Sequence, residues 1–189
     1  SDFGEFDGLP IVDPAYAERM AALQPAAWWR MGDGAGATVA DAVAGHHGAV
    51  AGQVLFGQPG AIAFDADAAI SLADGHIEVA ADAAFDFTAS QTLSLCGWTA
   101  PQVGGGSFMY IIGKGRTAAG STDQNWALRW QADAGAGELR LSFIYRDAAD
   151  AAWHRWVAAE PLVVDGAFHL VACVHTFGDG GAFRGYIDG

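Results

Sequence analysis

The sequence is short of basic residues and of long apolar runs, and each shortage excludes a class of protein. Nine Lys and Arg residues stand against 22 Asp and Glu residues, which leaves a net charge of −13. A surface with this charge repels a phosphate backbone, so nucleic acid is excluded as a partner. No apolar run approaches the roughly 20 residues that a membrane-spanning helix needs, so the sequence predicts no membrane span.

Cysteine is also scarce, whereas aromatic residues are abundant. Cys96 and Cys173 lie inside apolar runs and match neither a metal-ligand pair nor a disulfide framework, so we expect two buried free thiols. Seven Trp, eleven Phe and four Tyr among 189 residues supply ample surface to bury. This composition excludes an intrinsically disordered chain and is sufficient for a domain with a sizeable core.

The first 13 residues predict an extended arm. Residues 1–13 carry Gly, Pro and acidic side chains around Phe3, Phe6 and Leu9, without a period that defines a helix or strand. A segment without a core of its own gains order by binding something else. These three apolar side chains are therefore our candidates for docking the arm onto a protein partner.

The next segment, residues 14–24, predicts a short amphipathic helix. Asp13 is a suitable N-cap, and Pro14 suits the first helical turn. The spacing of Tyr16, Met20 and Leu23 places these three side chains on one helical face. The proline at position 25 ends the helix.

From residue 25 onward the apolar period changes from 3.6 to 2, and Gly, Asp and Pro clusters separate the runs. The pattern predicts an all-β domain over residues 25–189. Side chains that alternate across this many strands favour an antiparallel two-sheet β-sandwich of jelly-roll type. The clearest alternating runs are residues 93–97, 126–130, 139–145 and 168–174.

Several segments of this domain are similar, in their order along the chain, to the motifs of one family. They are residues 27–33 (AWWRMGD), 41–52 (DAVAGHHGAVAG), 59–65 (PGAIAFD), 92–98 (TLSLCGW), 111–115 (IIGKG), 165–172 (DGAFHLVA) and 185–189 (GYIDG). The chain thus resembles the laminin-G-like jelly roll of the concanavalin A-like lectin and glucanase superfamily. The resemblance covers residues 26–189 and implies a concanavalin A-like fold, although Phe168 stands where Trp is usual.

The resemblance also bears on which strands of the jelly roll are present and on the kinds of protein that contain such a module. Members of this family continue past a Y-V-D-G motif with a further hairpin and a closing strand. The resemblance therefore implies that the jelly roll here lacks its closing C-terminal strands. The lead-in at residues 21–33 is similar to that of laminin-G-like modules in phage structural proteins and in large bacterial surface proteins.

The carboxylates do not form the catalytic pattern that enzymes of this superfamily use. Retaining glucanases of this fold carry an E-x-D-x-x-E strand, which brings two carboxylates to about 5 Å from each other. Glu78 here is followed by Val, Ala and Ala before Asp82, whereas Glu138 and Glu160 are isolated. A G-x-S-x-G elbow and a phosphate-binding loop are also missing. We therefore expect no enzymatic activity.

Calcium is the one metal that the sequence favours. The histidines match no zinc spacing, whereas seventeen of the 22 acidic residues are Asp, and hard oxygen ligands suit calcium. The resemblance implies a calcium ion at the rim of the sandwich, with Asp41, Asp65 and Asp74 as candidate ligands by position. The competing interpretation is that these residues are ordinary turn formers.

Clustered aromatic residues are the candidates for binding a ligand. Aromatic planes flanked by hydrogen-bonding groups can stack on sugar rings or anchor a protein interface, although a sandwich core also uses Trp. Because Trp153 and Trp156 are three positions apart in a strand, they point to opposite faces, and we expect one of them to be exposed. The candidates are Trp126, Trp130, Trp153, His154, Arg155 and Trp156.

Three hypotheses about function follow. The first is a non-catalytic structural or attachment module on the surface of a phage or virion-like particle, such as a head-decoration, fibre or tail protein. Its arm would dock onto capsid, tail or other subunits, and a homo-oligomer is compatible with it. The second is a carbohydrate-binding or adhesive module of a bacterial cell-surface or secreted protein that recognises a cell-surface glycan. The third is a glycan-active enzyme with an unrecognised carboxylate pair.

Overall fold

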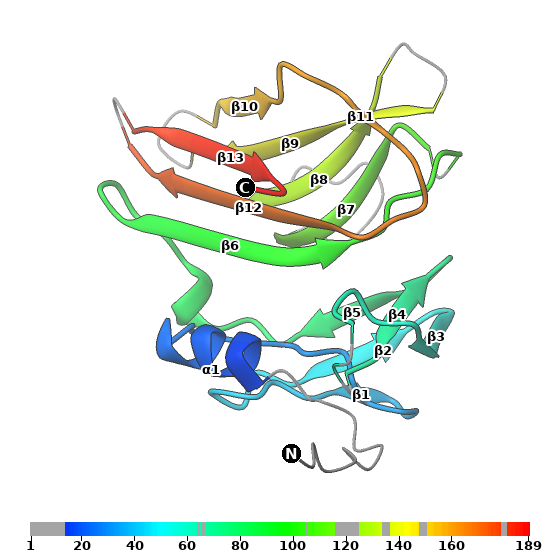
Figure 1. Ribbon diagram of the computed structural model, residues 1–189. Coiled ribbons are helices and arrows are strands. Elements are labelled where there is room, and N and C mark those ends of the chain that lie inside the picture. Colours follow the sequence, from blue (N-terminus) through cyan, green and yellow to red (C-terminus); the bar gives the residue numbers. More distant parts are fainter. Residues whose placement is uncertain are drawn as a thin grey trace, which may run out of the picture. The chain divides into compact units, whose positions relative to one another are not determined.

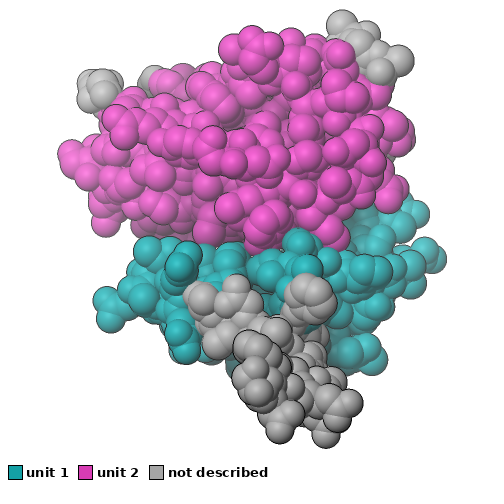
Figure 2. All heavy atoms as spheres, viewed as in Figure 1, with its two compact units in different colours: residues 1–84 teal, residues 85–189 magenta. Residues whose placement is uncertain are grey.

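A computed structural model describes residues 14–63, 65, 67–104, 106–115, 125–133, 137–147, 151–178 and 181–189 (Figure 1). The protein is mostly β, with 47% strand and one short α-helix in this part of the chain. It forms two compact units, residues 1–84 and residues 85–189 (Figure 2). The predicted arm, with Phe3, Phe6 and Leu9, lies outside the described residues.

The expected helix is present but shorter than the sequence predicts. Helix α1 spans Pro14–Ala22, and a turn follows in which the Leu23 amide donates to the Met20 carbonyl. Gln24, the residue before the proline, has a φ of 50°, which is incompatible with a continuing helix. Leu23 is therefore beyond the helix and 71% exposed, so the expected apolar stripe does not extend to it.

The first unit contains two small antiparallel sheets. In one, β2 (Gly48–Ala51) lies between β1 (Thr38–Val39) and β5 (His76–Val79). In the other, β3 (Val54–Gln58) pairs with β4 (Ala69–Leu72). Sequence reasoning placed residues 25–189 in one domain, whereas these five strands belong to a compact unit distinct from residues 85–189.

The second unit begins with the last residue of a short 3₁₀ helix and holds two larger antiparallel sheets (Figure 1). One sheet has the order β10-β9-β8-β7, with β11 also paired to β9; the other has the order β13-β12-β6. The elements are the 3₁₀ helix Ala83–Phe85, β6 (Thr92–Thr99), β7 (Phe108–Lys114), β8 (Trp126–Ala132), β9 (Glu138–Arg146), β10 (Trp153–Val157), β11 (Leu162–Val163), β12 (His169–Thr176) and β13 (Phe183–Ile187).

The two sheets of the second unit enclose one apolar core, as the period of two predicts. Its buried side chains come from alternate positions of the strands, because successive residues of a strand point to opposite faces. The sandwich-like, all-β architecture is thus present, while the jelly-roll topology stays a prediction. The core consists of Leu93, Trp126, Leu128, Trp130, Leu139, Leu141, Phe143, Val171 and Cys173.

The thiols lie on different faces of their sheet. Cys173 is fully buried, and burial raises the pKa of its thiol to about 12, which makes it unreactive at neutral pH. Cys96 is exposed, so the prediction of two buried thiols is wrong for this residue. The alternation of β6 is the cause, since Leu93 faces the core and Cys96 is three positions further along.

Within the described ranges, no helix is both long and apolar enough to cross a membrane, in line with the expectation from the sequence.

Candidate functional site

An open pocket of about 340 Å³ lies in the second unit, where residues of β10 and β9 face residues of β12 and β13. This volume is within the range of small-molecule binding sites. Three of its lining residues carry basic side chains, namely His154, Arg155 and His175. The others are aromatic: Phe143, Tyr145, Trp153, Trp156 and Phe183.

The register of β10 on β9 positions half of this lining. Trp156 is paired with Phe143, a core residue, so the Trp156 ring is on the face that points toward the other sheet. There it packs on Phe183 of β13, with 4.4 Å between ring centroids. Gly185 makes room for the indole, because a Cβ at that position would lie 2.7 Å from the Trp156 ring.

Tyr145 lies between two imidazoles. His154, its partner on β10, stacks on it with 4.6 Å between centroids and only 7° between the ring planes. His175 of β12 contacts the same ring at 4.8 Å and an angle of 38°. His154 is exposed, whereas His175 is only 4% exposed. The pocket thus has one imidazole at its edge and one inside.

The buried His175 has unused hydrogen-bonding capacity. Neither of its ring nitrogens has a hydrogen-bond partner among the residues that the structure describes. Leaving a buried polar group unpaired costs about 1–3 kcal/mol, so such groups are rare in proteins and mark places where a ligand or water completes the pairing. This residue is the strongest indication that the pocket binds something.

Burial is the main reason why the pKa of His175 lies below its ordinary value of 6.5. Electrostatic interaction with the neighbouring His154 lowers the pKa of His175 further, whereas the nearby backbone of Ala182 opposes the shift without reaching hydrogen-bond geometry. His175 is therefore neutral at pH 7. A neutral imidazole offers one donor nitrogen and one acceptor nitrogen.

Four of the six aromatic-cluster candidates from the sequence come together here. Trp153, His154, Arg155 and Trp156 all line the pocket. Trp153 is 48% exposed and Trp156 is half-buried, which agrees with the expectation that only one of the two tryptophans faces solvent. Arg146 places its guanidinium over the Trp153 ring, 5.7 Å from the centroid, and so helps to orient the exposed indole.

Trp126 and Trp130 are a correction to the predicted site. They are 5% and 2% exposed in the core, so neither presents a ring face to a ligand. Their strand, β8, is paired on both edges, and the second sheet covers the face that carries the two indoles. The Trp130 indole N–H donates to the Thr99 hydroxyl instead.

Sequence reasoning missed the other half of the lining. It predicts no site role for Phe143, Tyr145, Phe183 or His175. The alternation of β12 carried a usable signal, because Val171 and Cys173 face the core and His175 continues the same face. A histidine at an inward position of a strand predicts a buried polar group.

The three candidate calcium ligands do not form a metal site in the part of the chain that the structure describes, where no three His, Cys, Asp or Glu side chains converge. Asp65 accepts the Asp67 amide and lies 3.9 Å from the Arg30 guanidinium. Asp74 is exposed. Asp41 is 6% exposed and serves its own turn. Calcium therefore stays a prediction without a supporting cluster.

Asp41 organises the loop between β1 and β2. Its carboxylate accepts hydrogen bonds from the backbone N–H groups of Trp28, Val43, Ala44 and His46, at 2.8 to 3.1 Å. Burial raises its pKa, but the four amide donors outweigh that effect and hold the pKa below 3.8. The stability it contributes is therefore present above pH 3.8 and is lost as the pH falls through the lowered value.

We predict that Asp41→Ala lowers the free energy of unfolding of the first unit by about 2–4 kcal/mol at pH 7, because four backbone amides lose their acceptor. Urea unfolding measures the change in the free energy of unfolding, and hydrogen exchange of the loop amides locates it. Asp74→Ala is the control and should change the free energy by less than about 0.5 kcal/mol. A calcium-dependent gain in stability that both variants abolish would contradict this turn-forming role.

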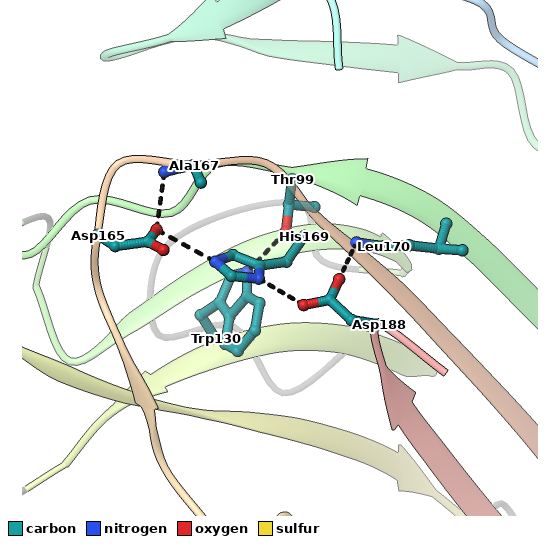
Figure 3. Close-up of polar contacts among 7 residues, drawn as sticks. All are labelled: Thr99, Trp130, Asp165, Ala167, His169, Leu170 and Asp188. Atoms are coloured by element: carbon teal, nitrogen blue, oxygen red, sulfur yellow. Dashed lines mark hydrogen bonds and ion pairs between the residues drawn. The ribbon is translucent and has the colours of Figure 1, made fainter. Parts of the chain in front are cut away.

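His169 forms a second polar cluster, at the opposite end of β12 from His175 (Figure 3). Its Nδ1 lies 2.8 Å from an Asp188 oxygen and its Nε2 lies 3.3 Å from an Asp165 oxygen. The second Asp188 oxygen accepts the Leu170 amide. The cluster joins β12 to the residue after β13. No hydroxyl or thiol nucleophile is hydrogen-bonded to His169 among the described residues, so we interpret the cluster as structural.

The cluster has a defined pH window. The hydrogen bond with Asp188, and then that with Asp165, raises the pKa of His169 above 6.5 despite its burial. Both carboxyl pKa values lie below 3.8: the Ala167 amide is the main cause for Asp165, and His169 is the main cause for Asp188. The stability that protonated His169 contributes is complete below pH 6.5 and is lost as the pH rises through the raised pKa. The carboxylate contribution fades below pH 3.8.

We predict that hydrogen-exchange protection of the Leu170 and Asp188 amides is greatest between the lowered pKa values of the two carboxyl groups and the raised pKa of His169. The protection should decline above neutral pH, and His169→Gln should abolish that decline. Gln retains a hydrogen-bonding side chain without the titration. Asp165→Asn is the matched variant and should keep the pH dependence in weakened form, because the Asp188 partner remains. An unchanged pH profile in His169→Gln would show that another group causes the decline.

No family model, curated protein or solved structure matches this chain. The resemblance to laminin-G-like domains therefore stays a prediction that rests on the motifs. The functional interpretation depends on the geometry of the pocket alone.

Proposed function

We propose that this protein is a non-catalytic binding module that holds a sugar ring in the pocket between β10 and β13. The observation that carries the proposal is the buried, unpartnered imidazole of His175 in a pocket lined by five aromatic residues. Aromatic faces stack on the apolar faces of sugar rings, and an imidazole can both donate to and accept from ring hydroxyls.

The composition of the lining supports binding without hydrolysis. Glycoside hydrolysis needs a pair of carboxyl groups flanking the scissile bond. The eight lining residues in the part of the chain that the structure describes include no Asp and no Glu. Of the three hypotheses, the carbohydrate-binding or adhesive module therefore agrees best with this site, on a scaffold that we take to be a jelly roll of the concanavalin A-like type.

Attachment to a virion-like particle is the other function that the sequence favours, with the particle surface as its location. It depends on an arm at residues 1–13 that lies outside the described residues. A bacterial cell-surface or secreted location is equally compatible with the pocket. Both stay predictions, and a glycan-binding pocket is useful to either kind of protein.

An array of neutral and acidic oligosaccharides tests the proposal. We expect the protein to bind at least one of them, and Trp153→Ala to weaken that binding by about tenfold, because the exposed indole offers the most accessible stacking face. Tyr186→Ala is the control: Tyr186 is 42% exposed on β13 but does not line the pocket. Binding to no oligosaccharide, or equal loss in the two variants, would refute this function.

A further inference from the structure

The pocket has a charge opposite to that of the chain as a whole. Acidic residues outnumber Lys and Arg by 22 to 9 in the sequence, yet among the described residues the lining contains no acid and three basic side chains. These are the two histidines that flank Tyr145, and Arg155, which lies between His154 and Trp156 in β10 and therefore leaves the strand on the opposite face, at the rim of the pocket. A lining of this kind is electrostatically suited to a negatively charged group.

Arg155 is the arginine that lines the pocket and, like Arg129 and Arg184, it has no ion-pair partner among the described residues. Arg30, Lys114 and Arg140 each form an ion pair with an Asp. Arg155 is exposed and has no such partner among the described residues. Its guanidinium is therefore available to a ligand carboxylate or sulfate, with which arginine forms charge-assisted and often bidentate hydrogen bonds.

We propose that the pocket selects a sugar ring that carries an anionic group, with Arg155 holding the anion at the rim and His175 hydrogen-bonding the ring inside. The proposal rests on the proposed function and adds the class of ligand to it. Because the net charge of −13 repels anions at long range, the selectivity arises at contact distance, within the roughly 8 Å over which charges act at physiological salt.

The neighbourhood of His175 gives this binding a pH dependence. Among the described residues, the groups that face the imidazole are Tyr145 from β9, His154 from β10 and the rings of Phe143, Phe177 and Phe183, so no described carboxylate favours its charged form. A bound anion would supply the missing negative charge. Binding of an acidic ring should therefore take up a proton and strengthen as the pH falls from about 7.5 to about 5.5, whereas binding of a neutral ring should not.

Titration calorimetry with three probes tests the inference: an oligosaccharide with uronic acid units, its sulfated counterpart and the matching neutral oligosaccharide. We expect tighter binding of at least one acidic probe than of the neutral one, and about a five- to tenfold loss of that preference in Arg155→Gln. Arg184→Gln is the matched control, since Arg184 is exposed on the other edge strand, β13, and does not line the pocket. His175→Gln should remove the proton uptake.

The outcomes separate this inference from the proposed function. If the neutral and acidic probes bind equally, or if the preference survives Arg155→Gln, the anionic selectivity is refuted while sugar binding stands. If none of the three probes binds and the array is also negative, both proposals fail. Comparison of the uronate and sulfate probes identifies which anion the rim accepts.

Discussion

The packing of Phe143 between the two sheets of the second unit is the contact on which core and pocket both depend. Its side chain is 1% exposed, and its ring lies 5.1 Å from that of Phe183 and 5.2 Å from that of His175. It belongs to the apolar core and also lines the pocket. The burial that stabilises the sandwich therefore also removes His175 from water and leaves its imidazole without a hydrogen-bond partner among the described residues.

The sequence predicted those features of the fold that are local. A period of two along residues 126–130 and 139–145 identifies β8 and β9, and the proline at position 25 marks the region where the helix ends. The cluster at residues 153–156 was found because two tryptophans three positions apart cannot both face a core. Each of these inferences uses neighbours along the chain, and the structure agrees with each.

The features that the sequence did not predict depend on which strands pair. Trp126 and Trp130 are buried because β8 is central in its sheet, whereas Trp153 is exposed on β10, a strand that pairs only with β9 in the described sheet. Nothing local distinguishes these two strands. Likewise, His175 meets Tyr145 and His154 only through the packing of one sheet on the other. The division at residue 84 also follows from long-range contacts and not from a linker composition.

The most direct test of the account is to observe the His175 ring while a ligand binds. Nitrogen NMR of selectively labelled histidine should show a neutral imidazole at pH 7, and its two ring signals should shift on addition of an acidic oligosaccharide that binds. The His169 ring, hydrogen-bonded to Asp188 at the far end of β12, is an internal reference and should not move. Binding that leaves the His175 signals unchanged would contradict the account, because the unpartnered imidazole would then have no part in recognition.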